Sequence, residues 1–282
     1  MSQPLPLWCH LNEVLQRCRT HERCVLLLDY DGTLTPIVND PDAARLSPTM
    51  QRLLDTLAQH PCYQVAIVSG RALADLRVRV RGEKLYLAGN HGLEIEGPGI
   101  HYDHPGVQRL RPQIDAVADA LQHDFSEIPG ALVEHKGYTL SVHVRRVPAA
   151  FVPEVRARLF QRAGPALDTG LLALRTGKAV LEVRPCVNWD KGQAVRWIVE
   201  RVRLEKPEAR LGVICMGDDD TDEDAFSVLD PADVGVVVGS DRPNSAAHYY
   251  VESVEEAERF LTILSGLTWP GAHGLATSDV PS

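Results

Sequence analysis

Asp29 and Asp31 are two carboxylates that lie two positions apart, directly after the apolar run 25–28. Carboxylates this close repel each other, so they need a bound cation or a shared proton. One aspartate can attack phosphorus and form an aspartyl-phosphate, while the other donates a proton to the leaving oxygen. The pair therefore indicates phosphoryl-transfer chemistry with Mg²⁺ offsetting the charge. The alternative is an acidic turn that Asp29 caps; a calcium loop is disfavoured because EF-hand spacing is absent.

A second group of acids follows the apolar run 211–216. Residues 217–224 read Gly-Asp-Asp-Asp-Thr-Asp-Glu-Asp, so six of eight positions are acidic. Some of these acids suit a helix N-terminus, where the helix dipole favours negative charge. Asp218 is nearest the end of the run, where it would join Asp29 and Asp31. Three carboxylates brought together require a divalent cation, and oxygen ligands with room for water and phosphate suit Mg²⁺.

Two further strand ends carry polar side chains. Ser69 and Arg71 follow the run 64–68, and a hydroxyl with a guanidinium suits phosphoryl oxygens. The alternative is that Ser69 caps a helix beginning near Ala72 while Arg71 is solvated. Asn90 and His91 lie between two glycines after the run 85–88, which indicates a tight loop near the same sheet edge. The sequence leaves open whether His91 is a structural loop residue or a substrate contact.

Lys191 is a cation at a position where helices prefer acidic residues. Asp190 is a suitable N-cap for the helix that begins there. A cation in the first helical turn opposes the helix dipole, so Lys191 indicates a residue kept for an anionic ligand.

These residues need a parallel sheet to bring them together. The apolar runs 25–28, 64–68, 85–88 and 211–216, with 234–238 and 249–251, predict buried strands separated by amphipathic helices. This order predicts an α/β fold with a Rossmann-like parallel-sheet core. Such sheets bind ligands beyond the carboxyl ends of their strands, which is where the candidate residues fall.

The pattern changes between residues 105 and 185. Two helices alternate with short strands there, and Thr139–Arg145 alternates apolar and polar residues. We expect a core at 1–104 and 186–266, an inserted α+β cap domain at 105–185 and a flexible tail at 267–282. A polar sheet face in the insert would suit a polyhydroxyl ligand, and the alternative is an ordinary solvated face. Its candidate residues are Glu134, Lys136, Arg145 and Glu182.

The composition narrows the class of protein further. The net charge of −9 argues against a general nucleic-acid binder and against an anionic membrane surface. The six cysteines form no C-x-x-C pair, and several lie in apolar runs, where cysteine behaves as a small hydrophobe. No secretion signal and no membrane-length apolar run is visible. We therefore expect a cytoplasmic protein.

The motifs together resemble a known family. D-x-D-G-T-L-T after a hydrophobic strand resembles the first motif of the haloacid-dehalogenase-like phosphatase superfamily. L-D-Y-D-G-T-L-T-P-I-V, V-S-G-R, G-N-H-G-L-E, L-E-V-R-P with N-W-D-K-G, and G-D-D-D-T-D-E-D-A-F resemble the trehalose-6-phosphate phosphatases. This resemblance spans about residues 25 to 265.

The resemblance implies a role for each candidate. Asp29 would be the nucleophile and Asp31 the general acid and base, while Ser69 and Lys191 would bind the phosphoryl group with Arg71 nearby. Mg²⁺ would be held by Asp29, the main-chain carbonyl of Asp31 and Asp218, with Asp222 in or beside that shell. The substrate would be a phosphorylated disaccharide whose hydroxyls meet Asn90, His91, Glu134, Lys136, Arg145 and Glu182. The family often carries a fused synthase domain, for which this chain has no room, so association with a trehalose-6-phosphate synthase is a further expectation.

Three other functions stay open. The nearest is a phosphatase for sucrose phosphate or glucosylglycerate phosphate with the same core. A catalytically silent sugar-phosphate sensor, or partner of a synthase, is a second, disfavoured because the nucleophile Asp29 is intact. A phosphomutase is a third, disfavoured because no second phosphate cluster is evident.

Overall fold

The structure is a computed structural model that describes residues 3–38, 40–177 and 179–269. The chain forms two compact units. One comprises the residues up to His101 together with those from Trp189 onward, and the other is Tyr102–Asn188. The second unit is therefore an insertion within the first, and each is described by itself.

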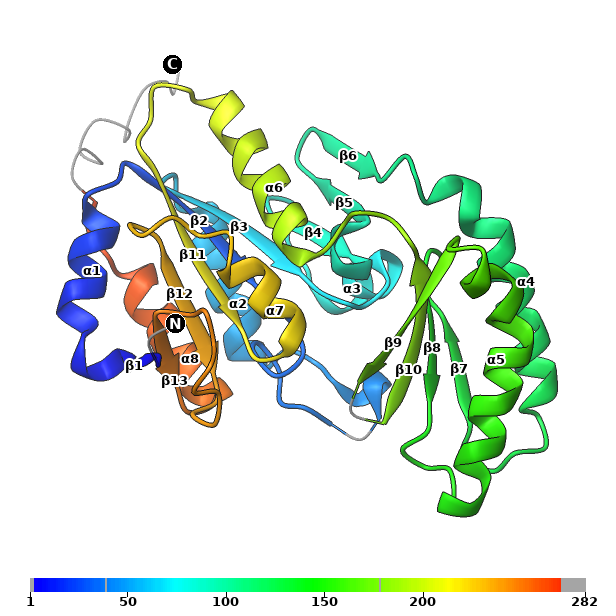
Figure 1. Cartoon of the computed structure of the whole chain (residues 1–282). Helices are drawn as coiled ribbons and strands as arrows, with labels where there is room; N and C mark the ends of the chain where they lie inside the picture. The colour runs from blue at the N-terminus through cyan, green and yellow to red at the C-terminus, as the bar shows by residue number, and fades with distance from the viewer. Residues whose placement is uncertain (1–2, 39, 178, 270–282) are drawn as a thin grey trace. The chain divides into compact units, whose positions relative to one another are not determined.

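The first unit is built on one large sheet (Figure 1). In the described residues its strand order is β1-β13-β12-β11-β2-β3-β4-β5-β6. The pairings from β1 to β4 are parallel, while β5 runs antiparallel to β4. The strands are β1 (Leu5–Pro6), β2 (Arg23–Leu28), β3 (Tyr63–Val68), β4 (Tyr86–Gly89), β5 (Glu94–Gly97), β6 (Ile100–Asp103), β11 (Leu211–Gly217), β12 (Val234–Val238) and β13 (Tyr249–Val251).

Helices cover both faces of this sheet. Leu26 and Leu28 of β2 belong to a buried cluster with residues of α2 and α8, such as Leu54 and Phe260. Side chains alternate along a strand, so Val25 and Leu27 point to the opposite face, where α6 contacts β2 and β3. The helices are α1 (Leu11–Arg19), α2 (Pro48–Gln59), α3 (Leu73–Arg79), α6 (Lys191–Glu205), α7 (Asp220–Phe226) and α8 (Val254–Ser265). This is the predicted Rossmann-like α/β core, and the fold prediction is confirmed.

The second unit is an antiparallel sheet backed by two helices (Figure 1). Its strand order is β7-β8-β10-β9. Leu140 and Val142 of β8 and Leu181 of β10 pack with residues of both helices in a separate hydrophobic cluster. The elements are α4 (Arg111–Asp124), β7 (Leu132–His135), β8 (Leu140–His143), α5 (Val152–Asp168), β9 (Leu172–Gly177) and β10 (Val180–Pro185).

Local capping agrees with the sequence at some points and differs at others. Asp190 caps α6, because its side chain accepts a hydrogen bond from the Gln193 amide at 2.8 Å. Ser69 does not cap α3: the N-cap is Ala72, which makes no side-chain cap bond. The alternating strand is shorter than predicted, since β8 ends at His143 and Arg145 lies beyond it.

The packed core extends into the segment expected to be a tail. Leu267 and Trp269 are buried, and the Trp269 ring packs edge-on against Tyr63 with centroids 5.3 Å apart. A side chain with this much apolar surface is stabilised by burial, which the expectation of a flexible tail from 267 overlooked. The rest of that predicted tail, 270–282, lies outside the described residues. Among the described helices, none is both long enough and apolar enough to cross a membrane.

Candidate active site

The turn after β2 places Asp29 at the carboxyl edge of the sheet. The Asp29 amide donates to the Met216 carbonyl of β11 at 2.9 Å, which continues the parallel ladder by one residue. The chain then turns, and the Leu34 and Thr35 amides donate back to the Tyr30 carbonyl. Gly32 has a φ of 86°, and a Cβ at this position would stand 2.2 Å from the Asp218 carboxylate. Only glycine lets the first loop approach the second acidic group this closely.

Lys191 joins the two acidic segments. Its Nζ lies 2.6 Å from Oδ1 of Asp29 and 2.5 Å from Oδ1 of Asp222. All three side chains are buried. Lys191 is the first residue of α6, so the helix end presents its ammonium group to the ends of β2 and β11. The sequence indicated an anionic ligand for this lysine, and in the structure its partners are two carboxylates of the chain itself.

Asp222 organises the loop after β11. Its Oδ2 accepts hydrogen bonds from the amides of Asp218 and Asp219, at 3.0 and 3.1 Å. Asp219 in turn caps α7 by accepting from the Thr221 and Asp222 amides, which completes a capping box. With Lys191 on its other oxygen, Asp222 holds the loop in a shape that turns Asp218 toward Asp29.

Burial of these acids perturbs their ionisation. Burial and the neighbouring carboxylates of Asp222 and Asp219 raise the pKa of Asp218 to about 7. Burial raises the pKa of Asp222 to about 6, although Lys191 acts against it, and it raises that of Asp29 well above its ordinary value. For Lys191, burial lowers the pKa but Asp222 and Asp29 raise it further, so the net shift is upward. One lysine does not balance three carboxylates of which two are buried and the third, Asp218, is partly buried.

The acidic group fits a divalent cation. Ligand oxygens of Asp29, Asp218 and Asp222 lie within 4.8 Å of one another. Oδ1 of Asp218 is buried and accepts no hydrogen bond in the described part of the chain. A buried carboxylate oxygen without a partner is costly unless a cation or proton compensates it. Carboxylate oxygens in this arrangement suit Mg²⁺, whereas both oxygens of Asp222 already have partners.

Ser69 and the Asn90–His91 turn meet at the ends of β3 and β4. The Asn90 amide donates to the Arg71 carbonyl at 2.7 Å, and the His91 amide donates to the Ser69 carbonyl at 2.8 Å. These bonds hold Asn90 and His91 at φ values of 51° and 57°, which are uncommon for residues other than glycine. The side-chain amide of Asn90 donates a hydrogen bond through Nδ2 to the Glu94 carboxylate at 2.6 Å. The predicted tight loop is therefore present at the sheet edge that carries Asp29.

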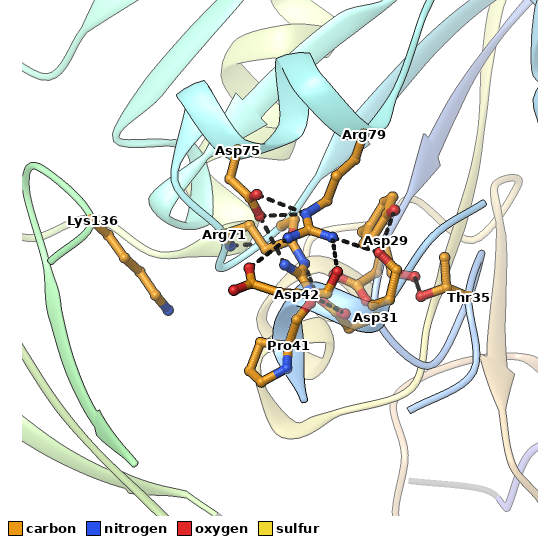
Figure 2. Close-up of polar contacts among 12 residues, drawn as sticks. Asp29, Asp31, Thr35, Pro41, Asp42, Arg71, Asp75, Arg79 and Lys136 are labelled. Carbon is orange, nitrogen blue, oxygen red and sulfur yellow. Dashed lines mark hydrogen bonds and ion pairs between the residues drawn. The ribbon is translucent and has the colours of Figure 1, made fainter. Parts of the chain in front are cut away.

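Arg71 is buried rather than solvated, and its guanidinium is surrounded by polar partners (Figure 2). Its guanidinium grips Asp31 with two bonds, Nε to Oδ2 at 2.6 Å and Nη2 to Oδ1 at 2.7 Å. Nη1 donates to Asp75 at 2.8 Å, and Nη2 also donates to the Pro41 carbonyl at 2.9 Å. Asp31 itself therefore turns its carboxylate to Arg71, and its side chain is not among the three clustered acids.

The candidates of the second unit lie on or near the polar face of its sheet. Glu134 on β7 and Glu182 on β10 both stand opposite Ser141 of β8 in the strand register. Nε2 of His143 forms a hydrogen bond with the Glu134 carboxylate, with 2.8 Å between nitrogen and oxygen. Nζ of Lys136 lies 3.9 Å from the same carboxylate. Arg145 is exposed. The structure thus places Glu134 and Glu182 on one sheet, with Lys136 just past the end of β7 and Arg145 just past the end of β8.

Sequence reasoning missed three residues around these groups. Asp75 and Arg79 lie on α3 and read as ordinary charges of a short helix, yet both belong to the Arg71 network. His143 is the third, and its contact with Glu134 depends on the strand register, which the sequence does not give. Charge spacing at i and i+4 from Arg71 to Asp75 to Arg79 was the available pattern.

Comparison with known proteins agrees with this geometry. The sequence profile of the family described as Trehalose-phosphatase matches residues 27–255. A trehalose-phosphate phosphatase of Mycobacterium leprae is 38% identical over 220 residues, covering 77% of this chain and 50% of that protein. Trehalose-phosphate phosphatase B of Arabidopsis thaliana is 36% identical over 251 residues, covering 85% of this chain and 66% of that protein. The chain thus spans about half to two thirds of the length of these relatives.

Solved structures show the same likeness. The C-terminal domain of trehalose-6-phosphate phosphatase from C. albicans superposes with a TM-score of 0.78 at 25% identity, covering 94% of this chain and 99% of that one. A trehalose-6-phosphate phosphatase from Aspergillus fumigatus gives a TM-score of 0.63 at 28% identity, covering 95% and 100%.

A parallel sheet with Asp29 at the end of its central strand, a lysine at a helix start and a second acidic loop after β11 define the haloacid-dehalogenase-like phosphatase class. Within that class, the chain belongs to the trehalose-phosphatase family.

Proposed function

We propose that this chain hydrolyses trehalose 6-phosphate to trehalose and inorganic phosphate in a Mg²⁺-dependent reaction. The observation that carries the proposal is the buried contact of Lys191 with Asp29, at 2.6 Å, in a chain of the trehalose-phosphatase family. A nucleophile needs an ionised carboxylate, and the ammonium group favours that form where burial alone would protonate it.

The proposed reaction has two steps. Asp29 attacks phosphorus in line and forms an aspartyl-phosphate, while Asp31 gives its proton to O6 of the leaving sugar. Asp31, now ionised, takes a proton from the water that cleaves the aspartyl-phosphate. Ser69 and Lys191 donate hydrogen bonds to the phosphoryl oxygens. Mg²⁺, held by Asp29, the Asp31 carbonyl and Asp218 with Asp222 behind them, would neutralise charge on the transferring group.

The sugar would be recognised by polar side chains of both units. Asn90 and His91 are the candidates of the core. Glu134, Lys136, Arg145 and Glu182 are those of the inserted unit, for which we retain the proposed role of a cap. The carboxylates of Glu134 and Glu182 supply acceptors, and the ammonium group of Lys136 and the guanidinium of Arg145, which follow the ends of β7 and β8, supply donors; a disaccharide with many hydroxyls requires both. Closure of such a unit would link sugar recognition to exclusion of water.

We also propose a cytoplasmic location and association with a trehalose-6-phosphate synthase. The first is supported by the acidic composition and the cysteines, which are free in the described structure. The second is supported only by the family, whose members often carry both activities.

The experiment is phosphate release with and without Mg²⁺ from trehalose 6-phosphate, sucrose 6-phosphate, glucose 6-phosphate and glucosylglycerate phosphate. We expect strong selectivity for trehalose 6-phosphate and loss of at least about 1,000-fold in kcat for Asp29→Asn, because the amide cannot attack phosphorus. Asp220→Asn is the matched control, since Asp220 is exposed and lies in the same acidic segment without joining the cluster.

The outcomes separate the alternatives. Release from another sugar phosphate would keep the aspartate chemistry and overturn the substrate. No release from any ester by folded, Mg²⁺-loaded protein would favour a silent sensor. The fold alone does not decide this, because the C-terminal domain of a trehalose synthase regulatory protein from Candida albicans shares it with a TM-score of 0.65 at 14% identity.

A further inference from the structure

Arg71 has almost no hydrogen-bonding capacity left for a substrate. A guanidinium carries five N–H bonds. Two of them go to Asp31, one to Asp75 and one to the Pro41 carbonyl. The guanidinium also lies over the Tyr30 ring, 5.2 Å from its centroid. Arg71 is therefore fixed on several sides, and what it holds is the carboxylate of Asp31.

Asp75 is the charged group that binds the Arg71 guanidinium at the nitrogen that does not contact Asp31. It lies four residues along the chain, and its carboxylate contacts Nη1 of Arg71 at 2.8 Å. Burial acts to raise the pKa of Asp75, but the hydrogen bonds from Arg79 and Arg71 lower it overall, so the carboxylate is ionised at neutral pH. Asp75, Arg71 and Asp31 thus form a continuous chain of charge-assisted bonds (Figure 2).

We propose that Asp75 is a positioning residue for the reaction: it fixes the guanidinium of Arg71, which fixes the orientation of the Asp31 carboxyl group. The inference rests on the proposed function, in which Asp31 transfers a proton to and from the reacting oxygens. Such transfers depend on placement within a fraction of an ångström, and misplacement of a proton donor reduces the rate without weakening substrate binding.

Arg79 provides the matched control. It contacts the same Asp75 carboxylate, with Nε 2.7 Å from both oxygens, and it donates to the Ala44 carbonyl at 2.6 Å. Arg79→Gln removes a partly buried ion pair of Asp75 but leaves the bonds from Arg71 to Asp75 and from Arg71 to Asp31. A network that serves only stability would respond to loss of either partner in the same way.

The test compares two leaving groups. An alkoxide leaving from trehalose 6-phosphate needs a proton, whereas p-nitrophenolate leaves as a stable anion without one. For Asp75→Ala we expect kcat on trehalose 6-phosphate to fall about 10-fold or more, with KM nearly unchanged. The first-turnover release of p-nitrophenol from p-nitrophenyl phosphate should stay within about 3-fold of wild type. Asp75→Glu should restore part of the lost kcat. Arg79→Gln should keep a kcat on trehalose 6-phosphate close to that of wild type.

Each other outcome overturns the inference. Equal losses on both esters would mean that Asp75 serves only stability, as would equal losses in Asp75→Ala and Arg79→Gln. A rise in KM alone would mean that Arg71 binds substrate. If Asp75→Ala does not fold, Asp75→Asn, which keeps the shape of the side chain, replaces it in the same comparison.

Failure of the proposed function is detected separately, from the activity of the wild-type protein on the same esters. If wild type cleaves p-nitrophenyl phosphate but not trehalose 6-phosphate, the substrate is wrong, and glucose 6-phosphate serves as the alkyl ester for the same ratio. If wild type cleaves no ester, both proposals are overturned.

Discussion

At the scale of single residues, Lys191 is the group on which the acidic site depends. It is buried with Asp29 and Asp222, and no other cation is within salt-bridge distance of either carboxylate in the described residues. Burying an ion pair contributes little to stability by itself, but removing one partner leaves the other charge uncompensated. Lys191 therefore has two roles: its charge favours the ionised form of Asp29, against the effect of burial on the pKa of that group, and it permits the loop after β11 to fold against the end of β2.

Lys191→Met should destabilise the metal-free protein by about 3–5 kcal/mol, because two buried carboxylates lose their cation. Asp29→Asn should change the free energy of unfolding by no more than about 1 kcal/mol, since it removes one charge from a group with an excess of negative charge. Urea unfolding in EDTA measures both. Equal destabilisation by the two substitutions would contradict the assignment of Lys191 as the compensating charge.

At the scale of elements, the short helix α3 connects the loop after β3, which carries Arg71, with the turn after β2, which carries Asp31. Asp75 on its first turn holds Arg71, which reaches the turn after β2, and Arg79 on its last turn reaches the carbonyl of Ala44. The segment 41–44 is thus bonded to Arg71, which lies two residues before α3, and to Arg79, the last residue of α3. A helix of seven residues is marginal alone, so these tertiary bonds stabilise it as much as it stabilises them.

The ionisation of Asp75 makes part of this stability dependent on pH. Because its folded pKa is below the unfolded value, ionised Asp75 stabilises the protein above the unfolded pKa of about 3.9, and this contribution is lost as pH falls through the lowered folded pKa. We expect wild type to exceed Asp75→Asn in free energy of unfolding near pH 6, and the difference to shrink on acidification. Urea unfolding between about pH 6 and pH 3 measures it, and subtraction cancels the groups that both proteins share. A difference that grows on acidification would contradict this sign.

The sequence predicted the elements better than the contacts between them. Apolar runs such as Val25–Leu28 and Val234–Val238 predict buried strands on length and composition alone, and the structure confirms them. β1 (Leu5–Pro6) has only two residues, too few for a pattern, and was missed. The partners of Arg71 could not be predicted from the sequence either. Asp31 is 40 positions away, and its contact with Arg71 depends on how the turn after β2 packs beside α3.

At the scale of the whole molecule, each of the two units has a hydrophobic cluster of its own among the described residues. The inserted unit buries Leu140, Leu159 and Leu181 among its own residues, and the core unit buries a different set around Leu26 and Phe260. Each unit therefore has the apolar burial that an independently stable domain requires.

Leu140→Ala should destabilise the inserted unit by about 2–5 kcal/mol, because Leu140 is fully buried and its loss leaves a cavity. Amide hydrogen exchange should then accelerate across residues 102–188 while β2 and β11 keep their protection. The exposed Leu204→Ala of α6 is the control and should alter neither unit. Equal acceleration in β2 would show that the two units unfold as one.

The order of strands in the sheet has a consequence for synthesis on the ribosome. β2 pairs with β3 soon after both emerge, but its other neighbour, β11, begins at Leu211, which pairs with Arg23. At about 5–20 residues per second, the strand that leads to Asp29 waits roughly 10–40 s with one edge unpaired. Unpaired edges recruit other strands, so the nascent chain is exposed to misassembly during this interval. The inserted unit can complete its own sheet in the meantime, which keeps its strands from competing for that open edge.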